Sequence, residues 1–313
     1  ALEREDEPTL IVLHDLVGLA AADFNDVCQQ ALAQCKRLGD RFTIFDVREG
    51  DVAGFRNGIG TSDLAYGAAY HPYLVTSLTH RYDESQVTIA SGEKTSTLAE
   101  IATTDTARYN RVKKKLADQR VILPPSATIA GVYARVDRER GVWKAPANVS
   151  LAAVIGPTVQ ITHEEQERLN VDATTGKSIN ALRAFPGKGT LVWGARTLAG
   201  NDNEWRYVPV RRLFITIEES ARKATAFAVF EPNDASTWLK VKGMLESYLY
   251  GLWEQGALQG ATPEAAYYVN VGLGRTMSPQ DVLEGRMLVE IGVAAVRPAE
   301  FIVLRFSHKL VEA

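Results

Sequence analysis

Residues 9–46 read TLIVLHDLVGLAAADFNDVCQQALAQCKRLGDRFTIFD. The apolar runs Thr9–Leu13 and Phe42–Asp46 have the length and composition of short buried strands. Between them, apolar residues recur every three or four positions from Phe24 to Leu38, which is typical of one face of an amphipathic helix. A strand, a helix and a second strand in this order predict parallel strands joined by a crossover helix. We therefore expect an α/β fold.

The helix in this stretch has recognisable ends and carries both cysteines of the chain. Asp23 is predicted to cap its start and Gly39 to end it. Cys28 and Cys35 are seven residues apart, about 10 Å along the axis. A disulfide requires Cα atoms within about 7 Å. We therefore interpret both as reduced core residues of a cytoplasmic protein, with a redox pair as the minor alternative.

Length and composition limit the classes of protein to consider. The chain has 313 residues, 46% of them hydrophobic and 23% charged, and a formal net charge of −3. This favours a soluble globular protein of two domains, or of one large domain with insertions, and disfavours a general nucleic-acid binder, which is usually basic. No apolar stretch is long enough to predict a membrane span. The acidic residues 1–7 lack the apolar core of a signal peptide, and without an initiator Met we expect residues to be missing upstream.

Strand and helix signals continue to alternate downstream. A turn-rich break at Gly200–Asn203 predicts a boundary between domains 1–202 and 203–313. The polar stretch His80–Thr106 predicts a surface hairpin or loop. Further strands are expected at Tyr70–Thr76, Thr190–Trp193, Ala226–Phe230, Ala266–Val271, Met287–Val296 and Phe301–Phe306. Further helices are expected at Ala107–Arg120, around Ile129–Val136, near His163 after a Thr162/Glu165 capping box, at Val210–Ala224 and at Trp238–Gln255.

Two segments resemble catalytic motifs of hydrolases. Residues 60–65, GTSDLA, are similar to the nucleophile segment of subtilisin-like proteases, which would make Ser62 the nucleophile. The upstream HGTH segment of such proteases is absent, and His14 is the only histidine before the serine. Residues 163–167, HEEQE, begin like a zinc-binding HExxH motif, but Glu167 replaces the second histidine. An acidic first helical turn is the simpler interpretation.

Glycine-rich segments give equally weak signals for nucleotide binding. Residues 187–190, GKGT, resemble the end of a Walker loop, but the preceding glycine is missing and a strand is expected to follow. Residues 272–274, GLG, lack the third glycine of a dinucleotide fingerprint. The five histidines form no ligand cluster along the sequence. We predict no catalytic residues, cofactor or metal, and keep an α/β hydrolase using Ser62 or a nucleotide binder using the Gly187 turn as alternatives.

An ordered series of segments along the chain decides between these possibilities. It is similar to the contractile tail sheath family of phages and related injection systems. The segments are LPPSATIAGVYARVDRERGVWKAPAN (123–148), GTLVWGARTL (189–198), WRYVPVRRL (205–213), FEPND (230–234), QGALQG (255–260) and IGVAAVRPAEF (291–301).

The resemblance implies a structural protein. It implies a subtilisin-like α/β sheath domain without protease activity at 1–202 and a smaller α+β sheath C-terminal domain at 203–313. It implies a minimal subunit that forms stacked hexameric rings around an inner tube and contracts to drive the tube through a membrane. The implied partners are further copies, the tube protein, and baseplate and terminator proteins, with no nucleic acid and no membrane insertion. Assembly would take place in the bacterial cytoplasm, for a phage tail or phage-tail-like particle. A non-contractile scaffold is a further alternative.

The last apolar segment is the candidate link between subunits. It comprises Phe301, Ile302, Val303, Leu304, Arg305 and Phe306. An unpaired strand of this kind is an aggregation hazard, whereas pairing with a neighbour's sheet makes it a specific link. Pro298 lacks a backbone donor, which favours a break in strand pairing between Val296 and Phe301. The alternative is that this strand completes its own sheet.

The helix expected at Trp238–Gln255 is the candidate tube-facing element. The resemblance implies that a helix of the C-terminal domain faces the inner tube. Its apolar stripe is expected to point into the core, which leaves Lys240, Lys242, Glu246 and Glu254 for contacts with charges on the tube. An ordinary solvated face is the alternative.

Overall fold

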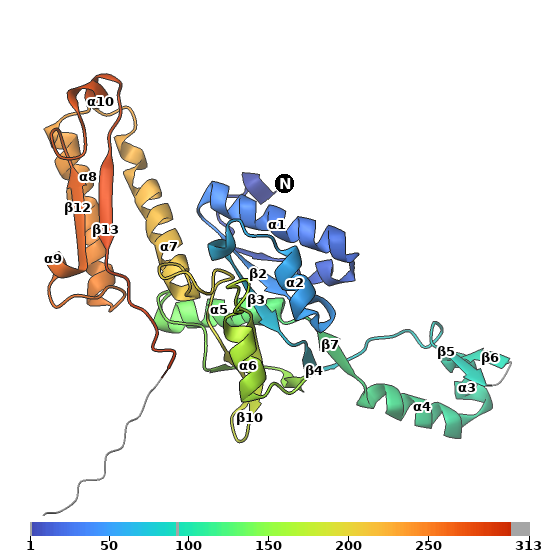
Figure 1. The fold of residues 1–313 in the computed structure, drawn as a ribbon. Coiled ribbons are helices and arrows are strands. Elements are labelled where there is room, and N and C mark those ends of the chain that lie inside the picture. Colours follow the sequence, from blue (N-terminus) through green and yellow to red (C-terminus); the bar gives the residue numbers. More distant parts are fainter. Residues whose placement is uncertain (1, 92–93, 302–313) are drawn as a thin grey trace, which may run out of the picture.

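A six-stranded sheet forms the centre of the molecule (Figure 1). The computed structural model of the chain describes residues 2–91 and 94–301. The strand order is β1-β2-β3-β10-β11-β8; β1, β2, β3 and β10 pair in parallel, and β11 is antiparallel to β10 and β8. The expected α/β class is thereby confirmed. The bounds are β1 Leu10–Val12, β2 Phe42–Asp46, β3 Gly67–His71, β8 Val149–Ser150, β10 Asn180–Phe185 and β11 Gly189–Trp193.

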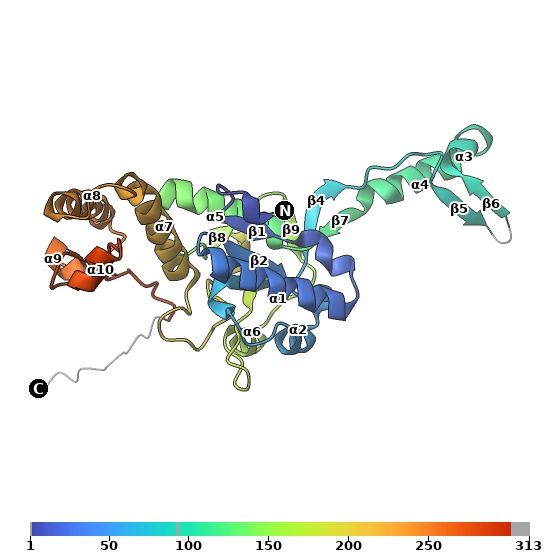
Figure 2. The ribbon, with the colours of Figure 1, turned by 90° about the horizontal axis from the view of Figure 1, so that it is seen from above.

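Helices cover both faces of this sheet. Along β2, Thr43 contacts Cys35 of α1 (Ala21–Leu38) at 3.0 Å. Phe42 packs against Tyr133 of α5 (Ser126–Arg140), with ring centroids 6.5 Å apart. Successive strand residues point to opposite faces, so α1 and α5 lie on opposite sides of the sheet (Figure 2). Every residue of β2 is buried as a result.

The ends of the helices agree only partly with the sequence predictions. Gly39 ends α1 in the left-handed conformation, with φ of 72°, as predicted. The predicted cap was wrong, because Ala20 precedes the helix and Asp23 lies inside its first turn. There its carboxylate faces the positive end of the helix dipole. Both cysteines are free and buried, as predicted. Two shorter helices, α2 Val52–Gly58 and α6 His163–Asn170, lie on the α1 side (Figure 2).

A slender arm projects from the central part (Figures 1 and 2). Its root is a three-stranded antiparallel sheet of β7, β4 and β9. The single strand predicted at Tyr70–Thr76 was wrong: β3 ends at His71 and β4 begins at Leu74, because Pro72 between them cannot donate to a ladder. The polar stretch does contain a hairpin. The bounds are β4 Leu74–Thr79, β5 Thr88–Ser91, β6 Lys94–Thr97, α3 Leu98–Thr104, α4 Thr106–Asp118, β7 Arg120–Leu123 and β9 Val154–Pro157.

The C-terminal part has its own core. Val241, Leu245 and Leu249 of α8 pack with Leu213 and Ile217 of α7 and with the β12–β13 ribbon. The helices expected at 210–224 and 238–255 are confirmed. The strand expected at Ala226–Phe230 was wrong, because this apolar run forms a 3₁₀ turn and an exposed loop. The bounds are α7 Val208–Thr225, α8 Ala235–Glu254, α9 Pro263–Ala266, β12 Tyr267–Val271, α10 Pro279–Leu283 and β13 Val289–Val293.

Helix α7 joins the two cores. Its Val208 and Ile215 belong to the core under the central sheet, while Leu213 and Ile217 belong to the second core. Arg212 donates to Asp137 of α5 at 2.8 Å, so a side-chain ion pair ties the two parts together. The boundary at 202/203 remains a prediction.

Candidate assembly surfaces

The chain returns from the C-terminal lobe to the central sheet after β13 (Figure 1). Backbone hydrogen bonds fix the beginning of this return: Gln259 donates to Ala294 at 2.7 Å, and Val296 donates to Ala257 at 3.3 Å. Arg297 then donates to the carbonyl of Asn203 at 3.1 Å. The segment 294–300 is therefore bound along the molecule, although it has no regular secondary structure.

Glu300 ends this segment in a charged clamp. The Arg196 guanidinium donates to its carboxylate at 2.8 Å through Nε and at 2.6 Å through a terminal nitrogen, and the Tyr207 hydroxyl donates at 3.2 Å. The Arg196 side chain is 6% exposed and that of Glu300 is 20% exposed. Burial alone would raise the pKa of Glu300, but the bonds and charge of Arg196 outweigh it and lower the pKa. The carboxylate is thus held ionised at a shielded site.

The clamp rests on the central sheet. Asn180, the first residue of β10, accepts from the Arg196 amide and donates to the Arg196 carbonyl, both at 2.8 Å. The Arg196 guanidinium also donates to the carbonyl of Gly200 at 2.5 Å. A bidentate arginine–carboxylate pair with a fixed backbone is geometrically specific. It fixes the position of the chain directly before Phe301, the last residue that the structure describes.

The clamp was not predicted from the sequence, although a signal was present. Arg196, Tyr207 and Glu300 each lie in a different segment of the family resemblance, respectively WGARTL, WRYVPVRRL and IGVAAVRPAEF. Of the predicted linking residues, Phe301 directly follows the clamp and is 69% exposed. Ile302, Val303, Leu304, Arg305 and Phe306 lie outside the described residues.

The predicted tube-facing residues lie along α8 but do not form one cluster. Lys242 and Glu246 are one turn apart and pair at 3.6 Å. Lys240 and Glu254 are exposed and are about 21 Å apart along the axis, at 1.5 Å per residue. The lysines precede the glutamates, which is opposite to the order that the helix dipole favours. This charge order therefore gives no stabilisation of the isolated helix through its dipole.

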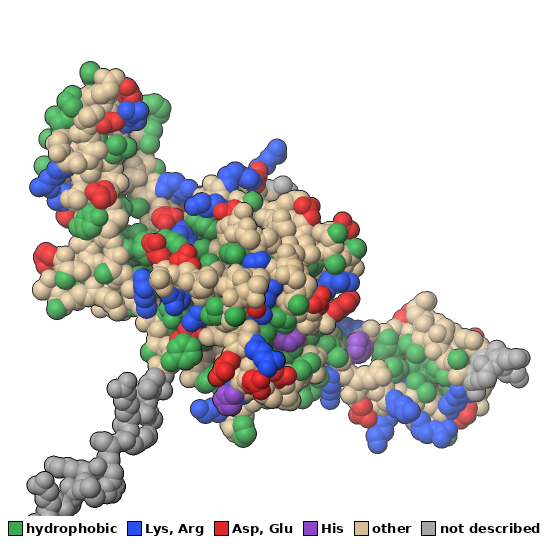
Figure 3. Space-filling view, in the orientation of Figure 1, with side chains coloured by type: hydrophobic (Ala, Val, Ile, Leu, Met, Phe, Trp, Pro, Cys, Tyr) green, Lys and Arg blue, Asp and Glu red, His purple; other side chains and the backbone are tan. Residues whose placement is uncertain are grey.

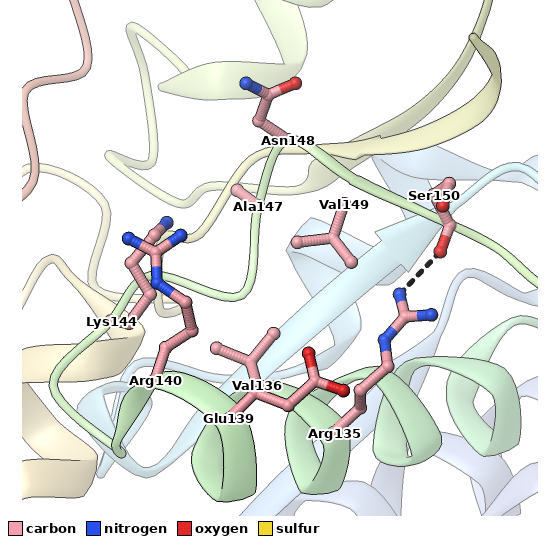
Figure 4. A pocket seen from close by; sticks show the side chains of 9 residues that line it. All are labelled: Arg135, Val136, Glu139, Arg140, Lys144, Ala147, Asn148, Val149 and Ser150. Carbon is pink, nitrogen blue, oxygen red and sulfur yellow. Dashed lines mark hydrogen bonds between the residues drawn. The ribbon is translucent and has the colours of Figure 1, made fainter.

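A hollow of about 680 Å³ adjoins the clamp. Its walls include the aromatic side chains of Trp143, Trp193, Tyr207 and Phe301. Arg140 and Lys144 lie at its border and also line a second hollow of about 490 Å³ between α5 and residues 147–150 (Figure 4). Burial, and then the neighbouring charge of Arg140, lower the pKa of Lys144. Neither cation has a carboxylate partner within residues 2–91 and 94–301.

The segments that resembled catalytic motifs have structural explanations. The Gly187 turn is the hairpin that joins antiparallel β10 and β11, where Gly187 and Gly189 both have φ of 73°. Residues 163–167 form the first turns of α6, with Thr162 and Glu165 in the predicted capping box. Ser62 is exposed, and His14 pairs with Asp15 at 3.3 Å. In the part of the chain that the structure describes, no group of three or more metal-ligating side chains is suited to an ion. The described helices also include none with the length and apolarity to span a membrane.

Comparison with known proteins identifies the family. Residues 73–198 match the phage tail sheath protein central domain, and residues 200–309 match the phage tail sheath C-terminal domain. The sheath of an extracellular contractile injection system, PVC, in its contracted state is 35% identical, with a TM-score of 0.72. This likeness covers 97% of the chain and 71% of that sheath. The contracted helical sheath of the anti-feeding prophage is 36% identical, with a TM-score of 0.73, over 98% of the chain and 72% of its own length. The chain belongs to the contractile tail sheath family.

Curated relatives are more distant and longer. A tail sheath protein of Vibrio phage KVP40 is 25% identical over 63% of the chain and 28% of its own length. A putative prophage major tail sheath protein of Pseudomonas aeruginosa is 26% identical over 56% of the chain and 44% of its own length. The matched regions thus span less than half of these relatives.

Proposed function

We propose that the chain is a structural subunit of a contractile sheath. It polymerises as stacked hexameric rings around an inner tube and contracts to drive the tube through a target membrane. The observation that carries this proposal is the likeness to two contracted sheaths over nearly the whole chain at 35–36% identity. We further propose the sheath domains 1–202 and 203–313, assembly in the bacterial cytoplasm, and a baseplate and a terminator as partners at the two ends.

Two surfaces serve this function in the proposal. Residues 301–306 pair as a strand with an adjacent copy, and the Glu300 clamp fixes the point from which they depart. A contact between two different surfaces of one chain is heterologous and generates open helical filaments. Lys240, Lys242, Glu246 and Glu254 face the tube. Exposed charge pairs are weak and screened by salt, which suits a surface that must release the tube during contraction.

The proposal includes the absence of enzymatic activity. The resemblance to a protease rests on residues 60–65 alone, and the resemblance to a Walker loop falls on a hairpin turn. We therefore expect the energy of contraction to be stored in the assembled lattice and to require no nucleotide. Stoichiometric reaction of Ser62 with a fluorophosphonate probe would support a hydrolase instead.

Negative-stain electron microscopy of the purified full-length protein tests the proposal. We expect hollow striated tubes, with two lengths that distinguish the extended and contracted states. Tubes that never change length would support a non-contractile scaffold. Discrete particles at all concentrations and salt conditions would contradict the proposal.

A further inference from the structure

An apolar knob stands at the free tip of the C-terminal lobe. It comprises Phe227, Val229 and Phe230, all exposed, in the loop between α7 and α8. Phe230 is fully exposed and has φ of 68°, a backbone conformation that is sterically unfavourable for a bulky side chain. Figure 3 shows further apolar side chains at this end of the molecule. Contiguous exposed apolar surface of this kind marks an interaction site.

The loop holds Phe230 in this position from both sides. The amide of Glu231 donates to Ala228 at 3.2 Å. Asn233 donates to the carbonyl of Arg286 at 3.0 Å and accepts from the Trp238 indole at 2.7 Å. Asp234 caps α8 by accepting from the Thr237 amide at 3.0 Å. The exposure of Phe230 is therefore a fixed feature of the FEPND segment and is maintained against an unfavourable backbone conformation.

The aromatic hollow beside the Glu300 clamp complements this knob. Its volume of about 680 Å³ accommodates an aromatic ring, and Trp143, Trp193 and Tyr207 offer aromatic contacts. The cations at its border, Arg140 and Lys144, have no carboxylate partner among the described residues. Glu231 follows Phe230 directly, is exposed, and has no cationic partner in the described ranges. Glu300 is the one carboxylate among the residues that line the hollow, and it is already paired with Arg196. Knob and hollow thus match in apolar character, and Arg140 and Lys144 remain available to Glu231.

We propose that the Phe230 knob of one copy inserts into the aromatic hollow of a neighbouring copy, with Glu231 beside Arg140 and Lys144. This inference rests on the proposed sheath function and adds a second link between subunits, distinct from the C-terminal strand. The knob and the hollow lie on different parts of the molecule (Figure 1). Each copy therefore donates one knob and accepts another, so the contact propagates along a polymer. The inserted knob would also lie beside the arginine–glutamate clamp, because Tyr207 lines the hollow and donates a hydrogen bond to Glu300.

Cross-linking in assembled tubes tests this contact. The variant Glu231→Cys/Lys144→Cys is treated with a short bismaleimide after assembly; the native Cys28 and Cys35 are buried and do not react. We expect a ladder of dimers, trimers and higher species on a denaturing gel. The control Lys114→Cys/Lys144→Cys, with its cysteine at an exposed position of α4 on the arm, should give no ladder. Should the first variant form no tubes, Val229→Cys/Ala147→Cys replaces it, since this pair keeps Phe230 and all the charges.

A second measurement uses the knob itself. Phe230→Ala should raise the concentration required for tube formation by about tenfold or more, as expected from the loss of one buried aromatic side chain. Leu78→Ala, which truncates an exposed apolar side chain of β4 at the root of the arm, should leave it unchanged. Tubes without a ladder, or a cross-link confined to single chains because the hollow is filled from within its own chain, would overturn the inference and leave the sheath function intact. Failure of the unaltered protein to form tubes would overturn both.

Discussion

Among the residues that the structure describes, Asp46 is the most deeply buried carboxylate, and it links the central sheet to a helix. It ends β2, and its oxygens accept from the amide of Ser126 at 2.7 Å and from the Ser126 hydroxyl at 2.5 Å, at the start of α5. Burial raises its pKa to about 6, although the bonds from Ser126 act in the opposite direction. The hydrogen bonds of Asp46 therefore hold the start of α5 against β2, while burial of the side chain makes its ionised form less favourable.

Replacement of Asp46 by Asn should change how stability depends on pH. An acid with a raised pKa in the folded state binds its proton more tightly there, so its contribution is most favourable at low pH. It declines as the pH rises from about 4 to about 6. The decline is on the order of 3 kcal/mol, since one pKa unit corresponds to about 1.4 kcal/mol. Asp46→Asn should remove this decline. The free energies of unfolding of the wild type and of the variant are measured in urea at pH 4 and at pH 7. The stability difference between the two proteins should then change between the two pH values. A difference that is constant across this range would contradict the assignment.

The clamp residue Glu300 gives a prediction with the opposite sign. Glu300→Gln leaves the buried Arg196 without its counter-charge, which should cost about 1–3 kcal/mol and lower Tm by a few degrees. Because the folded pKa of Glu300 is lowered, this loss should be complete at neutral pH and should vanish as the pH falls through that pKa. Thermal melting at pH 7 and at a series of lower pH values measures it. Glu254→Gln, at an exposed site on α8, is the control and should melt like the wild type. An unchanged Tm for Glu300→Gln at pH 7 would show that the clamp does not hold the segment.

At the scale of elements, the exposed charges of α8 can be changed without altering the face of this helix that packs in the core. Lys240→Glu/Lys242→Glu should leave the fold intact, because the main interaction lost is the weak ion pair between Lys242 and Glu246. It should weaken co-assembly with the inner tube, since it reverses charge on the proposed tube-facing surface. Co-sedimentation of sheath with tube across a salt series measures the effect. Lys114→Glu/Lys115→Glu on α4 of the arm is the matched control. Equal co-assembly of both variants would favour the solvated-face alternative.

The sequence predicted elements well where one face of the element is buried in a core. Helices α1, α5, α7 and α8 carry regular apolar stripes, and strand β2 is apolar because both of its faces are covered. The strand predicted at residues 226–230 was wrong, because this apolar run is on the surface and Phe230 is fully exposed. Composition alone does not separate residues that pack inside one chain from residues displayed on its surface.

The candidate site was predictable only in part for a related reason. Its polar residues come from three different segments and meet only through the fold: Arg196 follows β11, Tyr207 precedes α7, and Glu300 follows the C-terminal ribbon. No spacing rule connects them. Strand β10 was also missed, since Asn180 and Arg183 interrupt its apolar pattern, and Asn180 has a structural role in holding Arg196.

At the scale of the whole molecule, the same features make one chain both a stable body and a unit of a polymer. Two cores share α7, so displacement of one part strains the Arg212–Asp137 pair and the packing of that helix. The proposed contacts between copies are instead placed at the periphery, on the C-terminal segment, the Phe230 loop and the outer side of α8. Such a division lets subunits move as rigid bodies while their links remain connected.

This division predicts the behaviour of Val303→Pro. Proline removes one backbone donor and is incompatible with central pairing in a sheet. If residues 301–306 link subunits, the variant should melt at the wild-type temperature as a monomer and yet form no tubes, because the residues that form the two described cores all precede this segment. If the segment instead completes its own sheet, Tm should fall. Melting of the monomer and electron microscopy of the assembled sample, measured together, separate the two. Val311→Pro, beyond the proposed strand, is the control and should form tubes. Wild-type melting combined with normal tubes and normal contraction for Val303→Pro would exclude an essential role of this segment in either form.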